Sequence, residues 1–165
     1  LGPRDILAKA VKIIPVEFVV RNIAAGSLAK RMGVREGLEL KSPVLEFYYK
    51  SDALHDPMIN EYHIEAFELA DMGEIKTVND YSMDINSILS YAFSDVGITL
   101  VDFKLEFGLD KYDQVVLADE ISPDTCRLWD AESGDKMDKD RFRRDLGGMT
   151  EAYQEVWKRL QGGNH

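Results

Sequence analysis

A strict alternation of apolar and ionisable side chains runs through residues 100–108 and is the segment best suited to chemistry. In a β-strand successive side chains point to opposite faces, so this segment would place Asp102, Lys104 and Glu106 together on one face. An ammonium group between two carboxylates can form a solvated ladder of ion pairs, or it can belong to a site for charged ligands. The segment alone leaves both interpretations open.

Composition limits the class of protein. A chain of 165 residues with 45% hydrophobic content can bury the core of one domain. It has no apolar run long enough to span a bilayer and no leader of the secretory type, so we expect a soluble protein that is not exported. Cys126 is the single cysteine, which excludes an internal disulfide and fits a reducing compartment such as the cytoplasm.

The charge balance limits the partners. Thirty acidic and 20 basic residues give a net charge of -10, which opposes binding to nucleic acid. We therefore expect small-molecule partners, with neither nucleic acid nor membrane among them. An anionic ligand would need a local cluster of cations or a metal ion.

The elements that must position these residues form a mixed α and β pattern without repeats. Strands are predicted over residues 13–20 and 44–49, and Ser27 is predicted to cap a short helix that ends at Gly33. Apolar residues recur at helical spacing over 77–96, and Gly97 closes that helix. Two strands and a loop rich in Asp, Ser, Pro and Gly should follow, then helices over 138–146 and 149–160. Residues 161–165 should fray.

Several motifs carry a resemblance to a known family. The segments PVEFVVRNIAAGS at residues 15–27 and VDFKLEFG at residues 101–108 look like the two signature motifs of the SAICAR synthetase (phosphoribosylaminoimidazole-succinocarboxamide synthase) family. The similarity continues, in the order of the family, through HDPM (55–58), DEISPD (119–124), RLWD (127–130) and MDKDRFR (137–143). Several colinear motifs are a far stronger signal than one short pattern.

The resemblance implies an α+β fold: a small, mostly antiparallel sheet with packed helices, forming the C-terminal catalytic lobe over residues 15–160. Residues 1–14 would be the end of an N-terminal lobe and its connection, with residues 8–14 beside adenine. Family members carry a lysine-bearing loop over the nucleotide phosphates in that lobe. We therefore expect this chain to be the larger C-terminal part of the enzyme. The alternative is a non-catalytic ribonucleotide- and metal-binding or assembly module.

The reaction that the resemblance implies is an ATP-dependent carbon-nitrogen ligation of purine biosynthesis. L-Aspartate would be joined to 5-amino-1-(5-phosphoribosyl)imidazole-4-carboxylate through an acyl phosphate, giving the succinocarboxamide ribonucleotide, ADP and phosphate. A carboxylate resists attack by an amine until phosphorylation supplies a leaving group. Such transfer needs positioning and charge neutralisation more than a protein nucleophile. Magnesium is the expected ion. A homo-oligomer is also expected, because exposure of the surface that normally meets the N-terminal lobe would favour association.

By resemblance, Glu106 and Asp119 would hold Mg²⁺, an ion that prefers hard oxygen ligands. If the turn of the hairpin is centred between Tyr112 and Asp113, Glu106 faces Asp119 directly, roughly 5 Å apart at Cβ. A slip of one residue would break that pairing. Lys104 would act in catalysis by neutralising phosphate or the substrate carboxylate. Its structural alternative is an ion pair with Asp102 or Glu106.

The remaining site residues also follow from the resemblance. Asp102 would join Lys104 in catalysis, and Glu17 would join Lys104 in binding ATP. Arg21, Ser27 and Arg127 would bind the 5'-phosphate of the ribonucleotide, and Asp124 would lie close to its ribose. Arginine supplies a fork that matches phosphate oxygens, and a helix start near Ser27 would favour an anion. The structural alternatives are a helix cap for Ser27 and a surface ion pair for Arg127.

His55 and Asp56 precede a proline, a context typical of turns. By resemblance they border the place where aspartate enters, so we keep both as substrate-binding candidates. The three histidines form no zinc pattern, and Cys126 fits a packed thiol better than a nucleophile. The alternating charges over 135–145 predict a solvated helix, from which Lys139 or Arg143 could reach a partner subunit.

Overall fold

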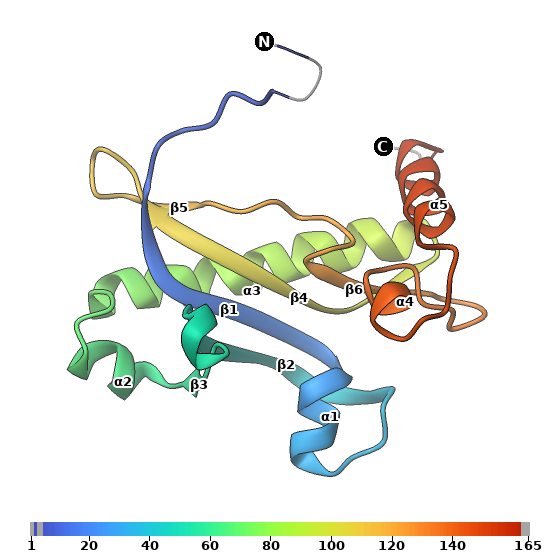
Figure 1. Ribbon diagram of the computed structural model, residues 1–165, viewed down its shortest axis with the longest axis horizontal. Helices are drawn as coiled ribbons and strands as arrows, with labels where there is room; N and C mark the ends of the chain where they lie inside the picture. Colours follow the sequence, from blue (N-terminus) through green and yellow to red (C-terminus); the bar gives the residue numbers. More distant parts are fainter. Residues whose placement is uncertain (1, 3–4, 163–165) are drawn as a thin grey trace.

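The computed structural model describes residue 2 and residues 5–162, in which six strands form one antiparallel sheet (Figure 1). Residue 2 and residues 5–11 have no regular secondary structure. The elements follow in the order β1 (Lys12–Ala24), α1 (Gly26–Met32), β2 (Leu38–Tyr49), the 3-10 turn η1 (Asp52–Leu54), β3 (Met58–Ile59), α2 (Glu61–Ala66), α3 (Met72–Asp95), β4 (Ile98–Leu109), β5 (Val115–Leu117), β6 (Cys126–Asp130), α4 (Asp140–Arg143) and α5 (Met149–Gly162).

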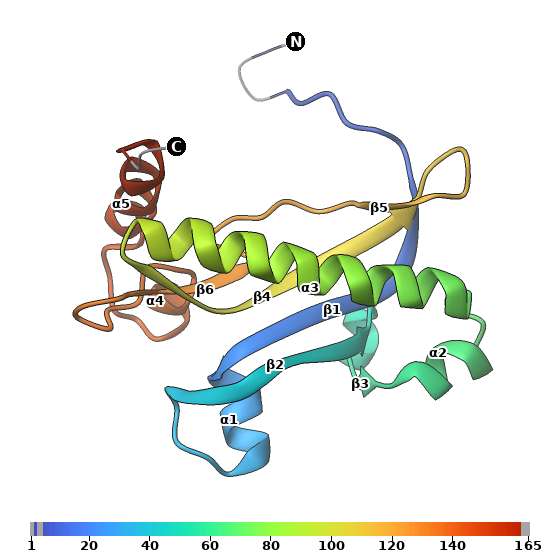
Figure 2. The same ribbon diagram turned by 180° about the vertical axis from the view of Figure 1, so that it is seen from behind.

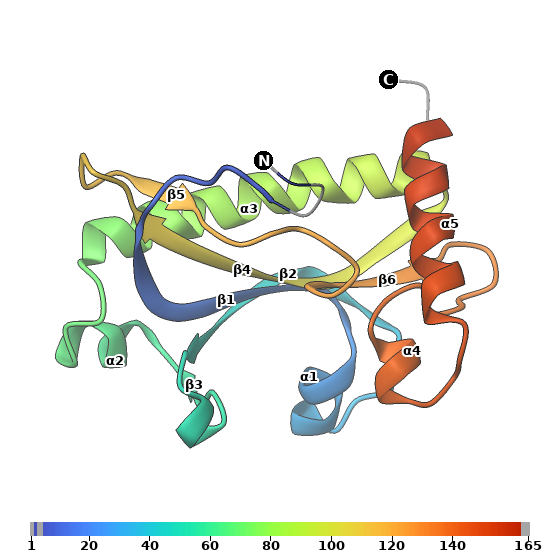
Figure 3. The ribbon, with the colours of Figure 1, turned by 45° about the horizontal axis from the view of Figure 1, so that its top comes forward.

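The strands are ordered β3-β2-β1-β4-β5, and β6 pairs with the other end of β4. The long helix α3 crosses one face of the sheet (Figure 2). On the opposite face, α1 and α4 lie together at one end, while η1 lies towards the other (Figure 3). The predicted α+β class with a mostly antiparallel sheet is confirmed.

The period-two pattern of β1 and β4 decides which face is the core. Phe18, Phe103 and Phe107 are almost fully buried on the side of α3, and Phe18 packs edge-on against Phe107 with ring centroids 5.6 Å apart. The ionisable residues between them therefore point to the other face. Register pairs Glu17 with Glu106 and Arg21 with Asp102, so residues far apart in sequence share one surface.

The predicted elements exist, with longer or shifted ends. Ser27 does not cap α1: the N-cap is Ala25 and makes no side-chain hydrogen bond, because the helix already begins at Gly26. Gly33 ends α1 with φ 64°, as predicted. The helix predicted over 138–146 is only the single turn α4, and Asp145, with φ 53°, is left-handed and leaves the helical conformation after it. Sequence patterns missed α2, η1, β3 and β6.

The register predicted for the hairpin of β4 and β5 is wrong by one residue. Phe107 pairs with Leu117, and Glu106 accepts a hydrogen bond from the amide of Ala118, not from Asp119. The turn is centred on Tyr112, because the Asp110 carboxylate accepts from the amides of Tyr112 and Gln114. Asp119 thus lies just beyond the end of β5.

Among the described residues, no helix combines the length and apolar character that a bilayer crossing requires. Gln161 and Gly162, predicted to fray, belong to α5, and residues 163–165 lie outside the described part of the chain.

Candidate active site

A cleft of about 630 Å³ lies on the face of the sheet opposite α3. A volume of this size suits a nucleotide-sized ligand. Eight of the eleven predicted site residues line it, and the three that do not are His55, Asp56 and Glu106. The lining residues are Glu17, Val19, Arg21, Ser27, Asp102, Phe103, Lys104, Asp119, Glu120, Asp124, Thr125, Cys126, Arg127, Lys139 and Arg143.

A second hollow, of about 780 Å³, lies beside the start of β1 and the α2–α3 junction. Glu65, Glu68, Asp71 and Glu74 line it, with Lys12 as the cation among its lining residues. That charge opposes an anionic ligand, whereas the first cleft contains a group of arginines.

Arg21, on β1, is 5% exposed and stands at the cationic end of the cleft. Its guanidinium donates to Glu46 at 2.9 Å and to Asp102 at 2.7 Å, and a third nitrogen, Nη2, donates to Ser27 Oγ at 3.1 Å. Burial alone would lower the pKa of Arg21, but the charges of Asp102 and Glu46 outweigh it and raise the pKa above its usual value. Arg21 is thus a fixed positive charge in a defined orientation.

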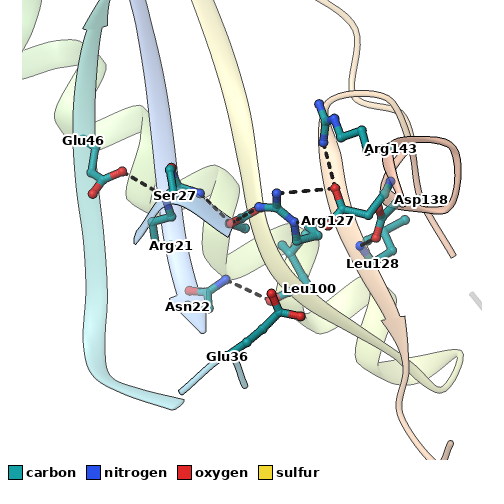
Figure 4. Close-up of polar contacts among 12 residues, drawn as sticks. Arg21, Asn22, Ser27, Glu36, Glu46, Leu100, Arg127, Leu128, Asp138 and Arg143 are labelled. Carbon is teal, nitrogen blue, oxygen red and sulfur yellow. Dashed lines mark hydrogen bonds and ion pairs between the residues drawn. The ribbon is translucent and has the colours of Figure 1, made fainter. Parts of the chain in front are cut away.

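Arg127, on β6, bonds to Asp102 on β4 from the side opposite Arg21. Its Nη1 donates to both oxygens of Asp102, at 2.9 and 2.6 Å, and its Nε donates to Asp140 at 2.7 Å. Asp102 Oδ2 accepts from Arg21 as well, so the two guanidinium groups lie side by side. Figure 4 shows Glu46, Arg21, Ser27 and Arg127 in a row across the strands. The predicted phosphate-binding residues are therefore brought together.

The other end of the cleft is acidic. Lys104 Nζ lies 2.5 Å from Glu106, 3.2 Å from Asp119 and 3.3 Å from Glu17, so one ammonium stands among three carboxylates. Burial would lower the pKa of Lys104, but the bond to Glu106 and the charge of Glu17 raise it above its usual value. Glu106 is 6% exposed, and its second oxygen pairs with Lys50.

Asp119 is also held as an anion. Burial would raise its pKa, but hydrogen bonds from the neighbouring Glu120 and from Lys104 lower it overall. Asp119 and Glu106 bond to the same ammonium although the register does not pair them, because Asp119 reaches in from beyond the strand end.

The acidic end has the donor chemistry of a magnesium site. Glu106 and Asp119 present hard carboxylate oxygens around one point, which the ammonium of Lys104 shares. Among the described residues there is no group of three or more His, Cys, Asp or Glu side chains that could hold a metal. Magnesium commonly binds through one or two carboxylates together with phosphates and water, so these two residues fit it as partial ligands.

The ribose candidate Asp124 is exposed, and its Oδ1 accepts from the hydroxyl of Tyr153 on α5 at 2.8 Å. Lys139 Nζ lies 3.7 Å from the same oxygen. His55 is exposed and left-handed at φ 58°, and the Asp56 carboxylate accepts from the amide of Ser51. These two form the turn after η1. Lys50, which lies between β2 and η1, pairs with Glu106.

Sequence reasoning missed the residues that hold the arginines. Glu46 is 4% exposed and bonds to Arg21, Arg31 and the hydroxyl of Tyr48. Glu46 and Tyr48 alternate with apolar residues along β2, and this period of two could have indicated that they share one face of the strand. The solvated helix predicted over 135–145 is wrong in one respect: Asp138 and Asp140 are 1% and 2% exposed, because they bond to backbone amides and arginines.

Cys126 is a packed thiol, as predicted. It is 5% exposed, and burial raises the pKa of its thiol to about 12. A thiol with that pKa is protonated at neutral pH and is a poor nucleophile.

Comparisons with known proteins agree with this geometry. A family profile described as SAICAR synthetase matches residues 1–160. The phosphoribosylaminoimidazole-succinocarboxamide synthase of Clostridium kluyveri is 56% identical over 160 residues, which cover 97% of this chain and 68% of that protein.

Solved structures give the same result. The phosphoribosylaminoimidazole-succinocarboxamide synthase of Ehrlichia chaffeensis superposes with a TM-score of 0.90 at 48% identity, covering 94% of this chain and 67% of that one. A SAICAR synthetase in complex with ADP also has a TM-score of 0.90, at 50% identity and with coverage of 94% and 66%. The chain spans about two thirds of the length of these relatives.

The fold and the cleft define an ATP-dependent ligase, which confirms the enzyme class predicted from the motifs. The chain belongs to the SAICAR synthetase family. That membership places it in purine biosynthesis.

Proposed function

We propose that the chain joins L-aspartate to the carboxylate of 5-amino-1-(5-phosphoribosyl)imidazole-4-carboxylate at the expense of ATP. The observation that carries this proposal is the separation of charge along the cleft. Arg21 and Arg127 stand at one end, and Glu17, Glu106 and Asp119 surround Lys104 at the other. Arg21 and Glu17 are four residues apart on one strand, which corresponds to about 13 Å. The arginine end suits a phosphate dianion. The carboxylate end suits nucleotide phosphates with their metal ion.

The ribonucleotide would bind at the arginine end. Arg21, Ser27 and Arg127 would donate to its 5'-phosphate, because their donors converge and two of them are planar guanidinium groups. Asp124, held by Tyr153, would accept from a ribose hydroxyl. This orientation directs the imidazole carboxylate towards Lys104.

ATP would bind at the acidic end, against Glu17 and Lys104. Glu106 and Asp119 would hold Mg²⁺, which would supply positive charge to neutralise the phosphate oxygens. Lys104 is the cation best placed to neutralise charge where the two substrates meet, because its ammonium lies among the same carboxylates.

The reaction would proceed in two steps. An oxygen of the imidazole carboxylate attacks the terminal phosphorus of ATP, and ADP leaves. The amine of aspartate then attacks the acyl carbon, phosphate leaves with the former carboxylate oxygen, and the nitrogen loses a proton. Lys104 would neutralise the oxyanions of both steps. We assign Asp102 to positioning Arg21 and Arg127 instead of the catalytic role predicted for it, because both of its oxygens are bonded to guanidinium groups.

Aspartate would enter beside η1, where we retain His55 and Asp56 as candidates. Asp56 would stabilise the turn through the amide of Ser51, and exposed His55 would be free to meet an incoming carboxylate.

The test is calorimetric binding of the carboxylated ribonucleotide, followed by chromatographic detection of the succinocarboxamide product with ATP, Mg²⁺ and aspartate. We expect binding by the parent chain and loss of product in Lys104→Met, because methionine keeps the length of the side chain without its charge. A folded chain that does not bind the ribonucleotide would refute the proposal. Binding without product from any preparation would favour the non-catalytic binding module instead.

Two further expectations stay predictions: a homo-oligomer and a cytoplasmic location. Light scattering on the purified chain tests the first, and a mass of one chain over the working concentration range contradicts it. Fractionation of cells that produce the protein tests the second.

A further inference from the structure

Gly26 is the first residue of α1 and precedes the phosphate candidate Ser27. Its φ is +52°, a conformation that side-chain-bearing residues rarely adopt. A Cβ atom added here would lie 2.7 Å from Nη2 of Arg127, 3.1 Å from its Cζ and 3.3 Å from its Nη1. The guanidinium of Arg127 therefore lies directly against the backbone of Gly26.

Arg127 has little freedom to move away from an added methyl group. Its Nη1 is bonded to both oxygens of Asp102, and its Nε is bonded to Asp140. Asp140 is 2% exposed and accepts from Arg143 as well. A shift of the guanidinium would break buried, charge-assisted hydrogen bonds, which are costly to lose.

We infer that Gly26 is a positioning and specificity-determining residue for the phosphate of the ribonucleotide. Its missing side chain allows the Arg127 guanidinium to lie beside Ser27 and Arg21, so that all three donors reach one phosphate group. A side chain at position 26 displaces one of the three donors and leaves the rest of the cleft intact. This inference rests on the proposed function, since it concerns the same ligand.

The chain offers a matched control at the other end of the same helix. Gly33 has φ +64°, and a Cβ atom added there would meet nothing within 4 Å. Gly26→Ala and Gly33→Ala therefore share the backbone strain of an alanine in the left-handed region. They differ in the contact with Arg127.

Calorimetry should compare three proteins, the parent, Gly26→Ala and Gly33→Ala, each with the carboxylated ribonucleotide and with its dephosphorylated riboside. We expect Gly26→Ala to bind the ribonucleotide about ten- to a hundredfold more weakly, the loss of one charge-assisted hydrogen bond. Its affinity for the riboside should equal that of the parent. Gly33→Ala should bind both ligands as the parent does, although its melting temperature falls.

Equal ribonucleotide affinities for the two alanine variants would overturn the inference. So would an equal loss of affinity for the ribonucleotide and for the riboside in Gly26→Ala. If Gly26→Ala does not fold, both alanine substitutions should be made in an Arg127→Gln background, where glutamine withdraws the clashing atoms and the two substitutions should lower stability equally. A larger loss for Gly26→Ala than for Gly33→Ala in that background would also overturn the inference. The parent arm tests the proposed function separately: a parent that binds both ligands equally has no phosphate site, whereas the folding comparison still tests the contact.

Discussion

Arg21 bonds to two carboxylates, a hydroxyl of serine and a hydroxyl of tyrosine, so replacing it with lysine separates charge from geometry. Arg21→Lys keeps the positive charge. A single ammonium nitrogen cannot occupy the positions of the guanidinium nitrogens that reach Glu46, Asp102 and Ser27 on different sides. We expect the variant to fold with reduced stability and to lose most of its recognition of phosphate.

The contacts that remain determine how much stability Arg21→Lys loses. Glu46 keeps Arg31 and Tyr48 as partners, and Asp102 keeps Arg127, so neither carboxylate is left unpaired. The loss should therefore be close to that of one charge-assisted hydrogen bond, about 2 kcal/mol. For a domain of this size that loss lowers the melting temperature by about 4–8 °C. Loss of the fork should weaken binding of the ribonucleotide about ten- to a hundredfold.

Calorimetric binding of the ribonucleotide and of its riboside, together with thermal unfolding, measures both effects. Arg31→Lys is a suitable control, because Arg31 also pairs with Glu46 but does not line the cleft. It should leave both affinities unchanged. If Arg21→Lys weakens the two ligands by the same factor, Arg21 does not bind the phosphate, and the reasoning is refuted.

Three other outcomes are expected. Glu106→Gln and Asp119→Asn should each abolish the gain in ATP affinity on adding Mg²⁺, because they remove ligand charge with little change of volume; calorimetry that finds the parent's magnesium dependence in both variants contradicts the metal assignment. Burial raises the pKa of Asp138 to about 6, so its contribution to stability is complete below pH 4 and is lost as pH rises through 6. The free energy of unfolding of the parent, measured relative to Asp138→Asn, should therefore fall by about 3 kcal/mol between pH 4 and 7, and a constant difference contradicts this. Tyr153→Phe should weaken the ribonucleotide about three- to tenfold by releasing Asp124, and should leave the 2'-deoxyribose analogue unchanged if Asp124 bonds to that hydroxyl; equal weakening of both ligands argues against it.

Local patterns in the sequence predicted the faces and the ends of several elements. The alternation along β4 correctly separates Asp102, Lys104 and Glu106 from the buried phenylalanines, because side-chain direction in a strand depends only on parity. Gly33 correctly ends α1, because a left-handed residue there favours glycine. The motifs predicted the family, which the comparisons confirm.

Register could not be predicted from the same patterns. The turn between β4 and β5 depends on how the Asp110 carboxylate binds two amides, and this moves the pairing by one residue. Asp119 still reaches Lys104 because it follows the strand instead of belonging to it. The predicted proximity of Glu106 and Asp119 was therefore right for a different geometric reason.

Residue type and local periodicity specify which residues carry charge and which face of each strand they occupy. Which charges meet depends on how distant segments pack together. Glu46, Asp102 and Asp140 come from β2, β4 and α4, and they orient two arginines from β1 and β6. The contact of Gly26 with Arg127 likewise joins residues about a hundred positions apart. Such contacts depend on strand order and on close packing between distant segments, which no local pattern encodes.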